Sequence, residues 1–223
     1  MLFPSLIVDD FFDKPDNIVH FSKSLSFNSD GKSPGKRTKN LAQIDYSFFN
    51  WVNTKILALL YPQDITNIRY NALATFQKVP PNLKFNNWVH EDTSSQITAI
   101  LYLSKNNNIG TSIYKNKKLS SVLDLNQQIK YKYFTDSNIK DQRYLEDLNT
   151  EYKNNQSNFE ETLKVNGIYN RLFLFDSWNY HAAHKFVSKN NKSERLTYIV
   201  FFNDIYCANK QLQYPIPVMK RIK

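Results

Sequence analysis

The chain has 223 residues, of which 41% are hydrophobic and 15% are aromatic. This length suits one domain with a substantial core, and the composition excludes an intrinsically disordered chain. The net charge of +9 allows a polyanionic partner such as nucleic acid, but the lysines are spread along the chain, which favours a generally basic surface.

Three features of the sequence bear on the compartment. Cys207 is the single cysteine, so an internal disulfide is excluded and a reducing environment is expected. The N-terminal run MLFPSLIVDDFF lacks the basic start of a signal peptide and becomes acidic at Asp9. No apolar run reaches the length of a membrane span. We therefore predict a cytoplasmic protein with no membrane partner.

The N-terminal part, about residues 9–61, is predicted to form supporting helices after a short strand at residues 2–8. Asp13 is typical of a helix cap, and the clearest helix lies at residues 45–61, where apolar residues recur at steps of three and four. Residues 28–40 form a polar, partly basic loop with two interpretations. It is a lid that meets an acidic substrate or cosubstrate, or a flexible connector. The connector is favoured, because no feature of the sequence fixes this loop near other functional residues.

Strands dominate from residue 67 onwards, so a β-rich core is predicted over about residues 67–206. The run at residues 96–103 is apolar and β-branched with partial alternation, which indicates a strand with one buried face. A turn and a strand at residues 111–114 complete a hairpin. Residues 115–166 are polar and contain neither Gly nor Pro. We interpret them as an insertion with a helix at about residues 139–164, which either covers the mouth of a site or is a solvated flap.

A candidate metal site begins at His90-Glu91-Asp92, directly before the strand at residues 96–103. Residues two apart in an extended segment point the same way, so the His90 imidazole and the Asp92 carboxylate should converge. One imidazole and one carboxylate are two of the three groups in the facial triad that binds non-haem Fe(II). The same tripeptide is also common in surface turns, where the carboxylate caps the turn, so a second segment has to decide.

Residues 169–204 supply that second segment. After a strand and a short turn come His181 and His184, either of which would complete a metal site. The next strand opens with Arg195 and Thr197, whose side chains should point to the same side. A guanidinium fork beside a hydroxyl is a good receptor for a carboxylate.

Taken together, these segments resemble the 2-oxoglutarate/Fe(II)-dependent oxygenase superfamily, in its prolyl-hydroxylase-like branch. The resemblance covers about residues 70–204 and consists of WVHED, a strand ending YLS, NRLFLF, HAAHKF and RLT. The chain also looks like an uncharacterised, often phage-encoded subgroup of that branch, in which a Pro-Gly-x-Arg element stands where this chain has residues 34–37. The order of the elements is that of a double-stranded β-helix, a jelly roll of two sheets supported by N-terminal helices.

The resemblance implies that His90, Asp92 and His181 bind Fe(II), with O2 as cosubstrate. His181 is favoured over His184 because Asp-Ser-Trp-Asn-Tyr before it matches the usual approach to the distal ligand. Members that halogenate carry a small apolar residue in place of the carboxylate. Asp92 therefore implies hydroxylation or demethylation.

The resemblance also implies that Arg195 and Thr197 bind the distal carboxylate of 2-oxoglutarate. Tyr102 matches a tyrosine that donates to the same carboxylate in prolyl-hydroxylase-like members, although it is also well placed to be a core residue. The implied reaction hydroxylates an amino acid, a peptidyl residue or a small metabolite and releases succinate and CO2. The sequence identifies neither the substrate nor the oligomeric state.

Two other functions compete with this interpretation. A metal-binding jelly roll without oxygenase activity, such as an isomerase or a binding module, has no need of the carboxylate receptor at Arg195 and Thr197. A nucleic-acid demethylase or hydroxylase of the same superfamily would use the +9 charge, and it requires a continuous basic surface beside the metal.

Overall fold

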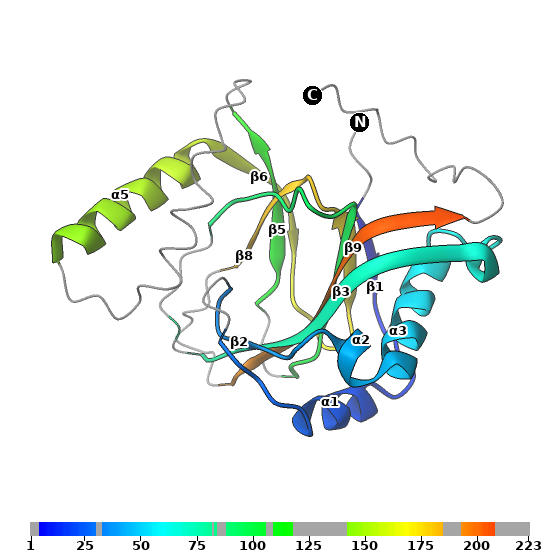
Figure 1. Ribbon diagram of the computed structural model, residues 1–223. Coiled ribbons are helices and arrows are strands. Elements are labelled where there is room, and N and C mark those ends of the chain that lie inside the picture. Colours follow the sequence, from blue (N-terminus) through cyan, green and yellow to red (C-terminus); the bar gives the residue numbers. More distant parts are fainter. Residues whose placement is uncertain are drawn as a thin grey trace.

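The fold consists of two antiparallel sheets, which the computed structural model describes over residues 5–29, 33–81, 83, 88–105, 109–117, 142–184 and 193–207 (Figure 1). The larger sheet has the strand order β1-β7-β4-β9-β3-β2, with bounds Leu6–Val8, Leu172–Asp176, Ile97–Tyr102, Arg195–Cys207, Ile68–Val79 and Lys36–Arg37. The smaller sheet has the order β6-β5-β8, with bounds Phe159–Val165, Thr111–Asn116 and Tyr180–Ala183.

The space between the two sheets, called the interior below, is filled largely by apolar side chains. Directly opposed residues on neighbouring antiparallel strands present their side chains to the same face. Phe173, Ile100 and Ile199 stand in one such row of the larger sheet, and they pack in one cluster with Ile113 and Val165 of the smaller sheet. Two sheets closed over a shared core form a double-stranded β-helix, so the fold predicted from the sequence is confirmed.

The outer face of the larger sheet is covered by the N-terminal helices, which are α1 (Pro15–Lys23), α2 (Leu41–Ile44) and α3 (Tyr46–Ala58), with a 3-10 turn at Ile65–Asn67 (Figure 1). Apolar residues of α3 such as Val52 and Ile56 share a cluster with Leu101 and Val200 of the sheet. The Asp45 carboxylate accepts a hydrogen bond from the Phe48 N–H at 2.9 Å and so begins α3.

The predicted cap at Asp13 is wrong. The residue before the first turn of α1 is Lys14, and it makes no side-chain cap hydrogen bond. Pro15 occupies the first helical position, where a missing N–H costs nothing and the fixed φ already suits a helix. The fixed φ of Pro15 therefore favours the start of α1, and no side-chain cap takes part.

The segment at residues 28–40 differs most from its prediction, since the structure gives it a strand. Arg37 of β2 stands opposite Gln77 of β3 and exchanges two backbone hydrogen bonds of 2.8 Å with Asn28. Gly35 has a φ of 75°, and a Cβ there would lie 2.1 Å from a backbone oxygen of β3. The interpretation as a flexible connector is therefore wrong for residues 33–40, which are fixed to the edge of the larger sheet.

The predicted insertion at residues 115–166 is described only in part. Its first residues end β5, and its last residues form β6, which pairs with β5. The predicted helix is α5 (Gln142–Ser157), which ends earlier than expected and extends away from the two sheets (Figure 1). Residues 118–141 lie outside the described part, as do the turn at residues 106–108, the loop at residues 188–192 and the tail at residues 208–223. Among the described helices, none has the length and apolarity needed to cross a membrane.

Candidate metal and cosubstrate site

His90 and His181 come from two segments that the backbone holds side by side. The two residues form an isolated antiparallel bridge, with the His90 N–H donating to the His181 carbonyl at 3.0 Å and the reverse bond at 2.7 Å. His181 belongs to β8, where it stands opposite Ile113 of β5. The two imidazoles therefore project from paired positions, and their ring centroids lie 4.4 Å apart.

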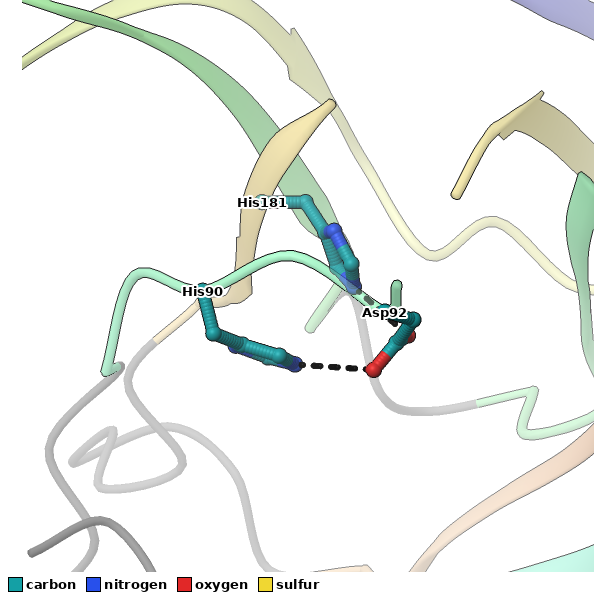
Figure 2. A group of neighbouring side chains, drawn as sticks. All are labelled: His90, Asp92 and His181. Atoms are coloured by element: carbon teal, nitrogen blue, oxygen red, sulfur yellow. Dashed lines mark ion pairs between the residues drawn. The ribbon is translucent and has the colours of Figure 1, made fainter. Parts of the chain in front are cut away.

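Asp92 completes this group from the turn that leads into β4. Its N–H donates to the Ser177 carbonyl at 2.8 Å, which ties the turn to the end of β7. The carboxylate meets both imidazoles (Figure 2), with Oδ2 at 3.2 Å from His181 Nε2 and Oδ1 at 3.8 Å from His90 Nε2. One ligand atom from each residue lies within 4.8 Å of the other two. We call His90, Asp92 and His181 the metal group.

Both imidazoles bond through Nδ1 to a backbone carbonyl, so that Nε2 is the atom directed at Asp92. His90 Nδ1 lies 2.9 Å from the Trp88 carbonyl, and His181 Nδ1 lies 2.7 Å from the Asn179 carbonyl. Because a carbonyl only accepts, each Nδ1 carries a proton, and in the neutral imidazole each Nε2 keeps a lone pair. A carbonyl on the far nitrogen is the usual support of a metal-binding histidine. The 3.2 Å separation of His181 Nε2 and an Asp92 oxygen suits a proton or a metal ion between the two atoms, so the donor set fits a metal ion.

Within the described part of the chain, the metal group is most exposed at His90 and Asp92. The side chains of His90 and Asp92 are 19% and 22% exposed, whereas that of His181 is 7% exposed. The Phe175 ring lies 4.8 Å from the His181 ring and closes the inner side. A ligand would therefore approach past His90 and Asp92.

His184, the alternative distal ligand, is engaged elsewhere. Its Nδ1 accepts a hydrogen bond from the Gly110 N–H at 3.2 Å, so its Nε2 carries the proton and donates to Ser112 Oγ at 3.0 Å. Burial, with a smaller contribution from the positive charge of Lys164, lowers the pKa of His184 to about 4. This imidazole is thus neutral near pH 7 and faces β5. The structure brings His181 to the other two ligand candidates, and it does not bring His184 there.

Arg195, Thr197 and Tyr102, called the carboxylate receptor below, lie together on the interior face of the larger sheet. Thr197 stands opposite Tyr102 of β4, and Arg195 precedes it by two residues in β9. The Arg195 guanidinium lies 5.5 Å from the centroid of the Tyr102 ring, and its Nε donates to the Ile109 carbonyl at 2.9 Å. The Tyr102 hydroxyl donates to Thr111 Oγ1 at 2.9 Å.

The carboxylate receptor is deeply buried. Burial is the main cause that lowers the pKa of Arg195 and raises the pKa of Tyr102. The cation–π contact with Tyr102 offsets part of the desolvation of the guanidinium. Thr197 Oγ1 is also buried, and it has no hydrogen-bond partner in the described part of the chain. A hydroxyl in this state costs about 1–3 kcal/mol, which a ligand with an acceptor oxygen would recover.

The sheet extends this polar surface to residues that sequence reasoning did not place in the interior. Arg37 of β2, Gln77 of β3, Thr197 of β9 and Tyr102 of β4 stand in one register, which we call the polar row. Gln77 is buried. No single strand carries a signal for this row, because it depends on the register between strands that are far apart in the sequence. The one available signal was the resemblance at residues 34–37.

Asn155, near the end of α5, holds the main chain directly before His90. Its Oδ1 accepts the Val89 N–H at 2.9 Å, and its Nδ2 donates to the Val89 carbonyl at 2.9 Å. Val89 also packs in a buried cluster with Phe159 and Ala182. The described part of the predicted insertion thus supports the metal group, which the sequence could not show because Asn155 lies 66 residues from Val89.

The sequence matches "Family of unknown function (DUF6445)" over residues 3–202. The chain belongs to this family. No curated protein matches this chain.

Solved structures share the fold of this DUF6445 chain. The non-haem α-ketoglutarate-dependent carbocyclase SnoK from nogalamycin biosynthesis has a TM-score of 0.53 at 10% identity and covers 89% of this chain and 79% of its own. Apo HygX from Streptomyces hygroscopicus has a TM-score of 0.52 at 10% identity, and the match covers 89% of this chain and 81% of the HygX chain. HygX with nickel and 2-oxoglutarate bound has a TM-score of 0.51 at 10% identity, and the match covers 88% of this chain and 82% of the HygX chain. At this identity the likeness shows the fold alone, and the phage-encoded subgroup stays a prediction.

Proposed function

We propose that the protein is an Fe(II)- and 2-oxoglutarate-dependent dioxygenase that hydroxylates an amino acid, a peptidyl residue or a small metabolite. The observation that carries this proposal is that the metal group and the carboxylate receptor open into one interior. Thr111 touches Tyr102, and Ile113 stands opposite His181. These two residues of β5 are two apart, about 7 Å along the strand, which suits a five-carbon dicarboxylate.

His90, Asp92 and His181 would hold the iron through the two Nε2 atoms and one carboxylate oxygen. Three protein ligands on one face leave open positions for a bidentate 2-oxo acid and O2. The bound iron and 2-oxoglutarate supply the oxidative chemistry that ends in succinate, CO2 and an oxidised substrate. Asp92 favours hydroxylation over halogenation, since its carboxylate takes the place that halogenating members of the superfamily leave for a halide.

The carboxylate receptor would orient the cosubstrate. The Arg195 guanidinium supplies a charged fork and Thr197 supplies a hydroxyl that gains a partner, while Tyr102 packs against the guanidinium and adds a second hydroxyl. The apolar rings of Phe173 and Phe175 exclude water from the same space. The protein's contribution is thus binding, orientation and shielding.

The rival functions find less support. A metal-binding jelly roll without oxygenase activity gives no reason to bury Arg195 or the Thr197 hydroxyl. A nucleic-acid substrate requires cations free to meet phosphates, but several on the described surface pair with carboxylates, namely Lys78–Glu194, Lys105–Asp16, Lys115–Glu160 and Arg171–Asp9. We also propose that one oxygenase domain spans residues 1–223, because helices and sheet share one core cluster. The single cysteine supports the cytoplasm as its compartment.

Anaerobic reconstitution with Fe(II) and 2-oxoglutarate tests the proposed function. The wild type should develop the visible charge-transfer band of the chelate, and after admission of O2 a mass-resolved substrate screen should detect succinate and an oxidised product. Asp92→Ala should lose both the band and turnover. Glu91→Ala is the matched control, because its side chain points the other way, and it should retain both. A full band and full turnover in Asp92→Ala would refute the assignment.

A further inference from the structure

Arg37 is a second arginine of the interior, and it is mounted rigidly. Its N–H and carbonyl both bond to Asn28, and its strand β2 pairs with β3, where Gln77 stands opposite. The next residue, Thr38, donates its N–H to the Phe76 carbonyl at 3.0 Å and accepts the Phe76 N–H on Oγ1 at 3.1 Å. The main chain at Arg37 is therefore held in place before any ligand arrives, which reduces the entropic cost of binding.

The guanidinium of Arg37 reaches from the polar row toward Phe201. It sits 5.8 Å from the centroid of the Phe201 ring. Phe201 stands opposite Thr98, and Thr98 Oγ1 lies 2.8 Å from Ser177 Oγ. The Ser177 carbonyl in turn accepts the N–H of Asp92. This chain of contacts leads from Phe201 to the metal group, whereas Arg195 is the first residue of β9.

Arg37 and Arg195 differ in exposure. Arg195 is 4% exposed, whereas Arg37 is partly exposed. Burial is the main cause that lowers the pKa of Arg195, and the positive charge of Arg37 acts in the same direction. Two guanidinium groups that face one space favour a second anionic group beside the cosubstrate.

We infer that Arg37 binds a carboxylate of the substrate, so that the enzyme acts on a small molecule or peptide with a carboxylate near the oxidised carbon. This inference rests on the proposed function, in which Arg195 and the metal take the two ends of 2-oxoglutarate. The aromatic ring of Phe201 lies against the guanidinium, and the planar fork presents two N–H groups that match two carboxylate oxygens. One cation suits a singly charged carboxylate better than a doubly charged phosphate.

The test uses matched ligand pairs, because the substrate is unidentified. The probes are the free L-amino acids, their primary amides and O-phosphoserine. Binding is measured by ligand-observed NMR on the metal-free protein and on the anaerobic Fe(II)·2-oxoglutarate complex. Wild type should bind one or more acids more tightly than the matching amides. Arg37→Gln should weaken the acids roughly 10- to 100-fold and leave the amides unchanged, and Arg37→Lys should recover part of the loss.

The control is Lys36→Gln, which removes the same charge from the neighbouring residue on the opposite face of β2, and it should leave the affinity for acids unchanged. Wild type that binds no acid better than its amide overturns the inference. So does a preference for O-phosphoserine alone, and so does a loss of 2-oxoglutarate affinity in Arg37→Gln as large as that in Arg195→Ala. Wild type without a 2-oxoglutarate band contradicts the proposed function instead, while Arg37-dependent binding of acids to the metal-free protein would still support the anion site.

Discussion

The two faces of the larger sheet differ in chemistry at one end of β4 and β9. On the outer face, β4 and β9 present apolar or aromatic residues such as Leu101 and Val200, which pack against the N-terminal helices. On the interior face, the same strands present Tyr102, Thr197 and Arg195, all of them buried. The alternation of side chains is identical for both faces, so the difference lies in what each face meets.

This contrast separates stability from function. Burying apolar side chains against helices stabilises the fold by about 25 cal/mol per Å² removed from water. Burying a guanidinium and an unpaired hydroxyl works against stability, since polar groups lose water without full compensation. Where a chain places such groups on a face that could have been apolar, a ligand is the expected reason. Substitutions on the outer face should therefore lower the free energy of unfolding, and substitutions on the interior face should lower the affinity for ligands.

The largest expected effect is on metal binding, and it concerns the two downstream histidines. His181→Ala should lose Fe(II) binding, because the metal group would keep only one imidazole. His184→Ala should keep Fe(II) affinity within a modest factor, since that imidazole bonds to the Gly110 N–H and to Ser112 of β5. Anaerobic Fe(II) titration of both variants gives the comparison. The reverse result would move the distal ligand to His184.

The outer face should show the largest effect on stability. Leu101 is fully buried between the sheet and the helices. Leu101→Ala should lower the free energy of unfolding by about 2–5 kcal/mol, because it removes apolar contacts and leaves a cavity. Denaturant unfolding measures this loss. The folded fraction of the variant should still bind 2-oxoglutarate normally, and a selective loss of cosubstrate affinity would contradict the division between the faces.

The interior face should show its main effect on the cosubstrate. Arg195→Ala should weaken 2-oxoglutarate by roughly one to two orders of magnitude, since hydrogen bonds to a charged group contribute about 1.5–3 kcal/mol each. Arg195→Lys should recover only part, because an ammonium does not match both oxygens at once. Titration of the anaerobic Fe(II) protein, followed by the charge-transfer band, gives these affinities. Iron affinity should stay near that of wild type, and an unchanged 2-oxoglutarate affinity in Arg195→Ala would remove the carboxylate receptor from the proposed function.

The smallest expected effect concerns the Thr197 hydroxyl, whose removal should change cosubstrate affinity and not stability. Thr197→Val removes the buried hydroxyl that has no partner among the described residues and keeps a similar shape. The free energy of unfolding should therefore stay within about 0.5 kcal/mol of wild type or rise. The 2-oxoglutarate affinity should fall roughly 2- to 10-fold, the usual contribution of a neutral hydrogen bond. A clear loss of stability with unchanged affinity would mean that the hydroxyl serves the fold alone.

Much of the fold and part of the site could be predicted from the sequence because their signals are local. The apolar steps of three and four within residues 45–61 mark α3, and the β-branched run at residues 96–103 marks β4. His90 and Asp92 are two residues apart in an extended segment, so a convergence of their side chains follows from the geometry of the chain. Arg195 and Thr197 share a face for the same reason.

Only the tertiary structure decided what depends on the register between distant segments. The bridge between His90 and His181 selects one of two downstream histidines, and contacts with β5 hold His184 away from the metal group. The pairing of β2 with β3 brings Arg37 to the interior, and the Asn155 amide fixes Val89 from the end of α5. The periodicity of a single segment shows which face a residue shares with its neighbours. Which strand lies opposite, and in which register, follows from packing over the whole core.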